Sequence, residues 1–259
     1  MTFLTDFGTK DGYAAQIKGV ALSITDARLI DITHDISPQN IYEGAFTLRS
    51  TVPSFPVGTV HVAVVDPGVG TERRSIIVTA KDHILVGPDN GLLIPVARLL
   101  GEFTVYEITN KEYMCQTISP TFHGRDIFAP VAAHILEGVP FEKFGNVIND
   151  FVELDFEMAE ITDKTAVGAI LAIDYFGNVI TNIGGNEIKK VLPHGKKITL
   201  IIGNKKREVL FLKAYNFIKK NQFLATIGSS NFLEIGLNQG NAAQKLKVKP
   251  GDKVKIIFS

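Results

Sequence analysis

Four short segments combine carboxylates, an arginine or a histidine with glycines, and they are where the first part of the chain could do chemistry. They begin at Thr5, Asp66, Gly87 and Thr121, each directly after a predicted strand or before a predicted helix. Because α/β sheets bind ligands at the ends of their strands, we expect the four segments to line one crevice.

The first segment carries two aspartates with different expected roles. Asp6 follows the predicted strand 1–5. A carboxylate at a strand end can accept two hydrogen bonds from a ribose diol, and this is the role we expect for Asp6. Asp11 precedes a predicted helix. It has two interpretations, a ligand contact or a cap for that helix, because aspartate is a favoured N-cap residue.

The second segment, Asp66–Arg74, follows the most apolar strand of the chain. Gly68 and Gly70 allow close backbone approach and can shape a nest for an anion or partial negative charge. The segment lacks the Gly-Lys-Ser/Thr ending of a phosphate-binding loop. The alternative is a tight loop with a surface Arg–Glu pair.

The third and fourth segments leave similar alternatives open. Asp89 and Asn90 either contact a ligand or cap the helix that follows them. His123 lies between Phe122 and Gly124 at a predicted helix entrance, where it can titrate or donate to a bound oxygen. A single histidine is more often structural, but three partner segments at matching strand ends favour a functional role.

Three turn segments of the second half could bind a ligand as well. Phe176 could stack on a purine, and Asn178 could pair with the purine edge because its amide both donates and accepts. Ser229, Ser230 and Glu234 could hold a zwitterionic amino acid. Ordinary hairpin-turn chemistry is the alternative for each segment. The segments are Asp174–Asn178, Gly228–Glu234 and Asn238–Asn241.

The elements that must position these residues indicate two domains. Strand–helix alternation over residues 1–150 predicts an α/β/α layered domain with a mostly parallel or mixed sheet. The acid-rich stretch 151–164 has no clear period and is expected to be a linker. Short β-rich runs over 165–259 predict a small all-β barrel or sandwich. The first 150 residues have a formal net charge of −6 and the remaining residues one of +6, a difference that also indicates two domains.

Composition excludes several classes of protein. The 259 residues are 45% hydrophobic and 21% charged, which excludes a disordered chain. Lys+Arg and Asp+Glu are equal at 27 each, which argues against a nucleic-acid or membrane-surface protein. Neither a run of ~18 apolar residues nor a basic leader occurs, so we expect no membrane helix and no secretory signal. Cys115, the only cysteine, cannot form an intrachain disulfide and fits a reducing cytoplasm.

Six motifs spread over essentially the whole chain carry a specific resemblance when taken in order. They are TDFGxxDGY, VVDPGVGTER, GPDNGLL, TFHGRDIFAP, DYFGNVITNI and GSSNFLEIGLNQGNA. The chain resembles the S-adenosyl-L-methionine (SAM) hydroxide adenosyltransferase family, the water-using relatives of fluorinases and chlorinases. This resemblance implies an N-terminal α/β domain, a C-terminal β-barrel, and trimers. In those trimers the ligand lies between the N-terminal domain of one subunit and the C-terminal domain of the next.

The resemblance also assigns residues. The family's triad falls on Asp66, Arg73 and His123. The halogenating relatives have a tyrosine at the Asp66 position and a serine in the stretch that here is Phe122-His123-Gly124. Ser230 stands where the fluorinase has an arginine. The expected substrate contacts are Asp6, Asp11, Asn90, Asp174, Tyr175, Phe176, Asn178, Ser229, Ser230, Glu234 and Leu237.

The implied reaction is hydrolysis of SAM to adenosine and L-methionine. The sulfonium departs as neutral methionine when water attacks ribose C5′. Arg73 and His123 are expected to hold the water oxygen, and Asp66 to orient the cluster or accept the proton. SAM is then a substrate. We expect no cofactor or metal, since no HxxxH or paired CxxC spacing is present.

Three other functions remain open at the level of sequence. A metal-dependent phosphohydrolase could use Asp6, Asp66, Asp89 and His123. A protein that binds adenosine or SAM without turnover would use the same contacts. A halide-dependent adenosyltransferase is the third, and Asp66 and Gly124 argue against it.

Overall fold

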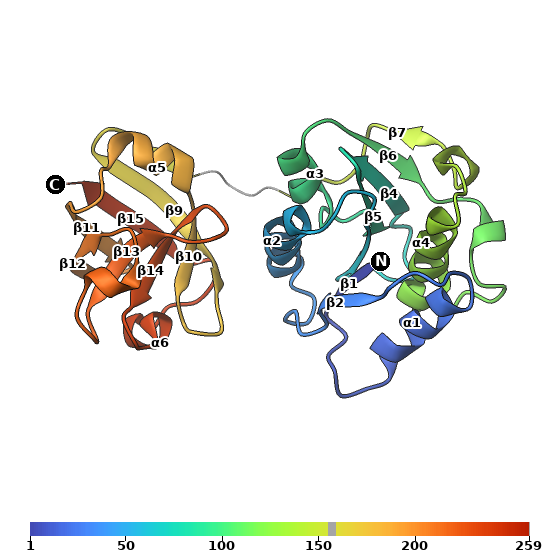
Figure 1. Ribbon diagram of the computed structural model, residues 1–259, viewed down its shortest axis with the longest axis horizontal. Helices are drawn as coiled ribbons and strands as arrows, with labels where there is room; N and C mark the ends of the chain where they lie inside the picture. The colour runs from blue at the N-terminus through green and yellow to red at the C-terminus, as the bar shows by residue number, and fades with distance from the viewer. Residues whose placement is uncertain (155–158, 259) are drawn as a thin grey trace. The chain divides into compact units, whose positions relative to one another are not determined.

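The computed structural model describes residues 1–154 and 159–258 and divides the chain into two compact units, Met1–Leu154 and Asp155–Ser259 (Figure 1). Each unit has its own hydrophobic core. Of the stretch 151–164 that was expected to be a linker, residues 155–158 lie outside the described residues. The same stretch contains a short strand, β8 (Glu160–Ile161), which pairs with the barrel strand β9 (Thr165–Ile173).

The first unit contains a mixed seven-stranded sheet with the order β2-β1-β3-β5-β4-β6-β7. The four strands β2, β1, β3 and β5 run parallel, whereas β4, β6 and β7 join by antiparallel pairing. The strands are β1 (Thr2–Thr5), β2 (Ile30–Thr33), β3 (Val60–Val64), β4 (Ser75–Ala80), β5 (His83–Pro88), β6 (Phe103–Glu107) and β7 (Val147–Ile148).

Helices cover both faces of this sheet, as Figure 1 shows. On one face, Phe3 of β1 shares a buried cluster with residues of α1 (Tyr13–Leu22) and α4 (Ala129–Leu136). On the other face, α2 (Ile41–Thr51) packs against α3 (Ile94–Leu100). Successive strand side chains point to opposite faces, so the next residue, Leu4, turns toward Gly44 of α2. The predicted α/β/α layering is therefore confirmed.

A buried histidine pair lies inside the sheet. His61 of β3 is 3.2 Å from His83 of β5, measured between Nε2 and Nδ1, and its Nδ1 is 2.8 Å from the Thr2 hydroxyl. Burial, followed by the neighbouring His83, lowers the pKa of His61 to about 3. Burial also lowers the pKa of His83. The core therefore holds both imidazoles in their neutral form.

We expect this pair to make the fold acid-sensitive. The unfolded chain takes up a proton at each histidine below about pH 6.5, whereas the folded chain resists it, so stability falls as the pH falls. His61 alone should lower the free energy of unfolding by about 2 kcal/mol between pH 7.5 and pH 5. Urea unfolding at the two pH values measures the difference. A His61→Asn variant with the same pH dependence as the wild type would contradict this assignment.

The second unit is a closed seven-stranded barrel, which confirms the predicted fold class. Its strand order is β10-β14-β13-β12-β11-β15-β9, and the β9–β10 pairing closes the ring. Only the β12–β13 pairing is parallel among those described. Beyond β9, the strands are β10 (Val179–Gly184), β11 (Lys197–Ile202), β12 (Lys205–Phe211), β13 (Phe223–Ile227), β14 (Phe232–Leu237) and β15 (Lys253–Phe258).

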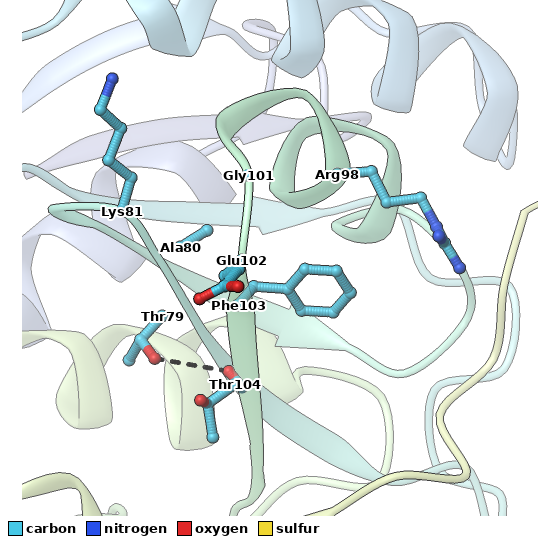
Figure 2. A pocket seen from close by; sticks show the side chains of 8 residues that line it. All are labelled: Thr79, Ala80, Lys81, Arg98, Gly101, Glu102, Phe103 and Thr104. Atoms are coloured by element: carbon cyan, nitrogen blue, oxygen red, sulfur yellow. Dashed lines mark hydrogen bonds between the residues drawn. The ribbon is translucent and has the colours of Figure 1, made fainter.

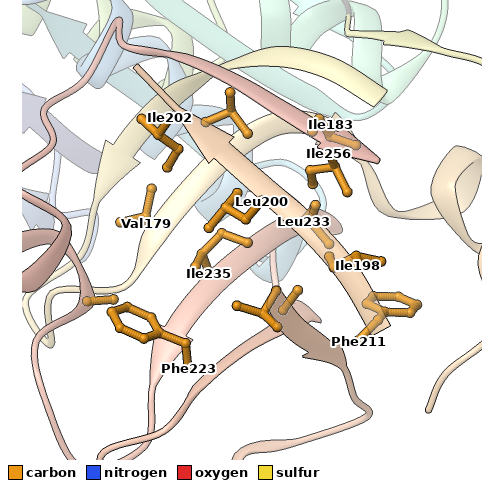
Figure 3. Packing of buried hydrophobic residues seen from close by; sticks show 14 of the residues in the cluster. Val179, Ile183, Ile198, Leu200, Ile202, Phe211, Phe223, Leu233, Ile235 and Ile256 are labelled. Carbon is orange, nitrogen blue, oxygen red and sulfur yellow. The ribbon is translucent and has the colours of Figure 1, made fainter. Parts of the chain in front are cut away.

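Inward-facing aliphatic side chains fill the barrel, as Figure 3 shows for Leu200, Leu233 and Ile235 among others. Two short helices that the sequence analysis did not predict belong to this unit, α5 (Gly185–Val191) and α6 (Ala242–Leu246). Buried residues of both helices join the barrel core. Within the described ranges, no helix combines the length and apolar character needed to span a bilayer.

Candidate active site

Three aspartates stand at one edge of the α/β sheet. Asp6 follows β1, Asp66 comes two residues after β3, and Asp89 follows β5. These three strands are neighbours and run parallel, so their carboxyl ends meet at the same edge. The topology therefore places the first three segments of the sequence analysis together.

The side chains of Asp66, Arg73 and His123 form one hydrogen-bonded group. Arg73 approaches Asp66 side-on, with Nε 3.0 Å from both carboxylate oxygens and Nη2 bonded to Oδ2. The same Nη2 lies 2.9 Å from Nδ1 of His123. Three residues that are up to 57 positions apart in the sequence therefore meet through one guanidinium group.

A close backbone contact brings together the two loops that carry this group. Gly70 has a φ of +78°, and a Cβ built on it would lie 2.3 Å from the carbonyl oxygen of Pro120. Only glycine allows both the positive φ and this approach. Gly70 thus joins the loop of Arg73 to the loop that leads into His123.

The group is largely shielded from solvent. The side chains of Asp66 and Arg73 are only 5% and 10% exposed, and the guanidinium carbon of Arg73 lies 5.2 Å from the centre of the Phe128 ring. Burial, followed by the charge of Arg73, lowers the pKa of His123. His123 is therefore neutral near pH 7.

Aromatic packing fixes the segment that carries His123. Residues Gly124–Phe128 form a π-helical turn ahead of α4. The Phe122 ring packs edge-on against Phe7 and Tyr13, with ring centres 5.6 and 5.3 Å apart. A Cβ on Gly124 would lie 3.1 Å from the Phe7 ring. The first and fourth segments of the sequence analysis are therefore in contact.

Asp6 and Asp11 have different environments. Asp6 accepts a hydrogen bond of 2.8 Å from the backbone N–H of Gln39 and is partly buried. Asp11 is exposed and does not cap α1, since Gly12 occupies the N-cap position without a side-chain bond. The capping alternative for Asp11 is therefore wrong, while a ligand contact remains a prediction for both aspartates.

The side chains of Asp89 and Asn90 form hydrogen bonds and an ion pair with other residues of the chain. Asp89 pairs with Arg74 at 2.8 Å and accepts a bond from the backbone N–H of Val152. Asn90 donates to the carbonyl of Val65 and accepts from the N–H of Leu92. Neither residue caps α3, whose N-cap position is Leu93, so the capping alternative is also wrong here.

The barrel unit contains a cavity of about 800 Å³, lined by the β9–β10 turn, the segment after β12, and residues along β13 and β14. Six of the expected contacts line it, namely Asp174, Phe176, Asn178, Ser229, Glu234 and Leu237. Tyr175 and Ser230 are not among the lining residues. Phe176 is 73% exposed although it lines the cavity, and Tyr175, 98% exposed, packs edge-on against it. An aromatic face is therefore open to a ligand here.

Hydrogen bonds preorganise the polar side chains of this cavity. Asp174 accepts from both the backbone N–H and the side-chain amide of Asn178, at 2.7 and 2.9 Å. The hairpin-turn interpretation of this segment is thus correct, and the same residues line the cavity. Glu234 accepts from the Tyr215 hydroxyl. Burial, together with the charge of Asp174, raises the pKa of Glu234.

Sequence reasoning missed several residues of these two regions. Tyr215 and Lys213 line the barrel cavity, and Ser75 contacts Arg73. None of them lies in a glycine-rich turn motif. Their positions two and four residues after β12, and at the start of β4, are the local signals that mark them.

A second cavity, of about 950 Å³, lies in the first unit between β4, β6 and α3 (Figure 2). Ala80 at the end of β4 pairs with His83 at the start of β5 and with Phe103 at the start of β6. This cavity is therefore at the opposite edge of the sheet from Asp66. None of the expected site residues lines it, and Arg98 on its rim is paired with Glu153.

Metal-ligating side chains do not gather in the described part of the chain. Across residues 1–154 and 159–258, no three His, Cys, Asp or Glu side chains form a group that could hold a metal ion. Asp6, Asp66, Asp89 and His123, the residues of the phosphohydrolase alternative, accordingly do not form such a group.

Comparison with known families and proteins agrees with the resemblance that the six sequence motifs carry. Residues 1–145 match the family model of the SAM hydroxide adenosyltransferase N-terminal domain, and residues 168–255 match that of the C-terminal domain. A protein of Methanocaldococcus jannaschii named (R)-S-adenosyl-L-methionine hydrolase is 40% identical, over 100% of this chain and 95% of its own. A protein of Salinispora tropica with the same name is 35% identical over 99% and 97%.

More distant relatives include a halogenating enzyme. A fluorinase of Nocardia brasiliensis is 28% identical over 99% of this chain and 96% of its own. Among solved structures, an uncharacterized conserved protein of Thermotoga maritima is 37% identical, with a TM-score of 0.95 and 98% coverage of both chains. A conserved hypothetical protein of Thermus thermophilus is 32% identical, with a TM-score of 0.78 and the same coverage.

Proposed function

The chain belongs to the SAM hydroxide adenosyltransferase family, and we propose that it hydrolyses SAM to adenosine and L-methionine. The observation that carries the proposal is the hydrogen-bonded, largely shielded group of Asp66, Arg73 and His123 at the sheet edge. This group offers a carboxylate and a neutral imidazole to a water molecule without needing a metal. The hydrolase names of the full-length relatives support the same reaction.

The substrate chemistry makes few demands on the protein. The sulfonium of SAM departs as the neutral thioether of methionine, so the leaving group needs no protonation. What the site must supply is a water molecule held in line behind C5′ of the ribose. Alignment of two reactants can account for about 7–11 kcal/mol of a barrier. SAM is thus a substrate, and the reaction requires no cofactor.

The stereochemistry at sulfur is a finer part of the proposal. The relatives' shared name specifies the R configuration of SAM. We extend that configuration to this chain, whose preferred substrate is then the (R)-sulfonium epimer. A site that distinguishes two epimers must fix both the adenosine and the methionine ends of the substrate.

Binding roles follow the expected contacts. Asp6 takes the ribose diol, and Phe176 and Asn178 take the adenine. The methionine end lies toward Asp11, Asp174 and the two serines Ser229 and Ser230. The barrel cavity of about 800 Å³, with its open aromatic face, supports these assignments.

Each unit by itself carries only part of these contacts, which supports the assembly that the family resemblance implies. In that assembly, a homotrimer, the α/β unit of one subunit and the barrel unit of the next together form each site. Light scattering of the purified protein tests this arrangement. A stable monomer that turns over SAM would contradict it.

The halogenase alternative is disfavoured by two residues. Asp66 stands at the position of the halogenases' tyrosine and is paired side-on with Arg73. Their halide-binding serine lies in the stretch that here is Phe122-His123-Gly124, and a Cβ on Gly124 would already lie 3.1 Å from the Phe7 ring. A serine would therefore require this aromatic packing to shift.

Product analysis tests the proposal. The purified protein is incubated separately with (R)- and (S)-SAM, with and without EDTA and with high chloride, and the nucleoside is identified by its mass. We expect adenosine and methionine in equal amounts, faster from the R epimer, with no effect of EDTA. A 5′-chloro nucleoside would support the halogenase, loss of turnover in EDTA the phosphohydrolase, and saturable binding without methionine the non-catalytic alternative.

A further inference from the structure

The guanidinium group of Arg73 has a protein acceptor for each of its five N–H bonds. Nε–H is directed at the Asp66 carboxylate, and Nη2 bonds to Asp66 and to Nδ1 of His123. Nη1 bonds to the Arg74 carbonyl at 3.2 Å and to the Ser75 hydroxyl at 3.0 Å. A guanidinium has five donors and no acceptor. Arg73 therefore has no N–H left for a water molecule.

This arrangement also determines the tautomer of the His123 ring. Because a guanidinium only donates, Nδ1 of His123 must accept the bond from Arg73, so the ring proton of the neutral imidazole is on Nε2. Protonation of Nδ1 would place two donors face to face beside a positive charge. The lowered pKa of His123 agrees with this picture.

We propose that Arg73 is a positioning residue, anchored by Ser75, that holds His123 as its Nε2–H form and leaves Asp66 and His123 to contact the attacking water. The proposal rests on the proposed function. It replaces the expectation from sequence that Arg73 itself holds the water oxygen. Ser75 is suited to this role because it is buried at the start of β4, next to the Arg74 carbonyl.

The assignment fixes where the proton goes. Nε2–H of His123 donates to the water oxygen and cannot accept a proton from it. The water oxygen forms its bond to C5′ as the C5′–S bond breaks, and the bonding pair leaves on sulfur. The oxygen then carries an acidic proton, which passes to the Asp66 carboxylate and on to solvent. A weakly basic carboxylate is sufficient for this step, because a protonated alcohol is a strong acid.

A spectroscopic test needs no turnover and so stays valid if the proposed function fails. Two-dimensional ¹⁵N spectra of protein labelled at histidine report which ring nitrogen carries the proton, and a His123→Gln variant identifies the signals of this residue. We expect a bare Nδ1 and a protonated Nε2 at pH 7.5. In an Arg73→Gln variant, the spectra of His123 should no longer show the Nε2–H tautomer alone. A protonated Nδ1 in the wild type would overturn the proposal.

A kinetic test addresses Ser75. Ser75→Ala should lower kcat by about fivefold to tenfold, the net value of a typical hydrogen bond, with KM unchanged. Ser75→Thr keeps the hydroxyl and should restore kcat. Thr79→Ala removes a hydroxyl from the same strand at the opposite sheet edge and serves as the control. Equal kcat in Ser75→Ala and the wild type, with both folded, would contradict the anchoring role.

Discussion

Replacing Asp66 with asparagine is expected to lower kcat for SAM hydrolysis by about 10²–10⁴-fold, while KM changes by less than about threefold. The amide has the size of the carboxylate but is a poor proton acceptor. It also presents N–H donors to the N–H donors of Arg73, which removes one side of the bidentate pair. His123→Ala should show the same pattern, because it removes the donor to the water oxygen. Steady-state kinetics with (R)-SAM measure both effects.

The matched control for this prediction is Asp82→Asn. Asp82 is an exposed aspartate in the hairpin between β4 and β5, at the opposite edge of the sheet. Its variant should retain the kcat and KM of the wild type. Far-ultraviolet circular dichroism confirms that each variant is folded. Near-normal kcat in a folded Asp66→Asn variant would show that this carboxylate does not take the proton.

Replacing Gly70 with alanine is expected to abolish most of the activity and to destabilise the fold. Its new Cβ would lie 2.3 Å from the Pro120 carbonyl oxygen, and its φ of +78° is unfavourable for alanine. The two loops that carry Arg73 and His123 must then separate. We expect a loss of about 2–5 kcal/mol in the free energy of unfolding, from backbone strain and overpacking together. Urea unfolding measures the loss.

Gly58→Ala separates the two causes. Gly58 has nearly the same φ, +81°, but a Cβ there meets no atom within 4 Å. Backbone strain alone should lower the free energy of unfolding of that variant, by about 1–2 kcal/mol, and the variant should retain its activity. If both glycine variants lost the same stability and both remained active, the contact with Pro120 would have no part in forming the site.

The sequence predicted most of the fold because its strongest signals are local. The buried strand Val60–Val64 is a run of β-branched residues, and the Lys81-Asp82 turn lies between two such runs. Elements without such signals were missed. The strands β7 and β8 have two residues each and lie in the acid-rich stretch 145–165, where no periodicity can develop. The helices α5 and α6 have seven and five residues, too few for a clear amphipathic pattern.

The candidate site was predictable only as far as its motifs extend. Gly70 and His123 could be identified because one lies in a glycine-rich turn motif and the other is a histidine at a predicted helix entrance. Ser75 and Tyr215 do not stand out, because their importance comes from partners that only the folded chain brings near. Asp89 and Asn90 illustrate a different case, in which capping was wrong and the substrate contact of Asn90 stays a prediction. They lie in a conspicuous motif, yet their side chains hold the backbone rather than cap a helix.

The most direct test of direct water attack is a single turnover of (R)-SAM in ¹⁸O-labelled water with the protein in excess. We predict that the adenosine formed carries one ¹⁸O atom, at the 5′ oxygen, and that methionine carries none. Attack by the Asp66 carboxylate, followed by hydrolysis of the ester at its carbonyl carbon, would instead transfer an unlabelled protein oxygen to adenosine in the first turnover. Unlabelled adenosine would therefore contradict the account.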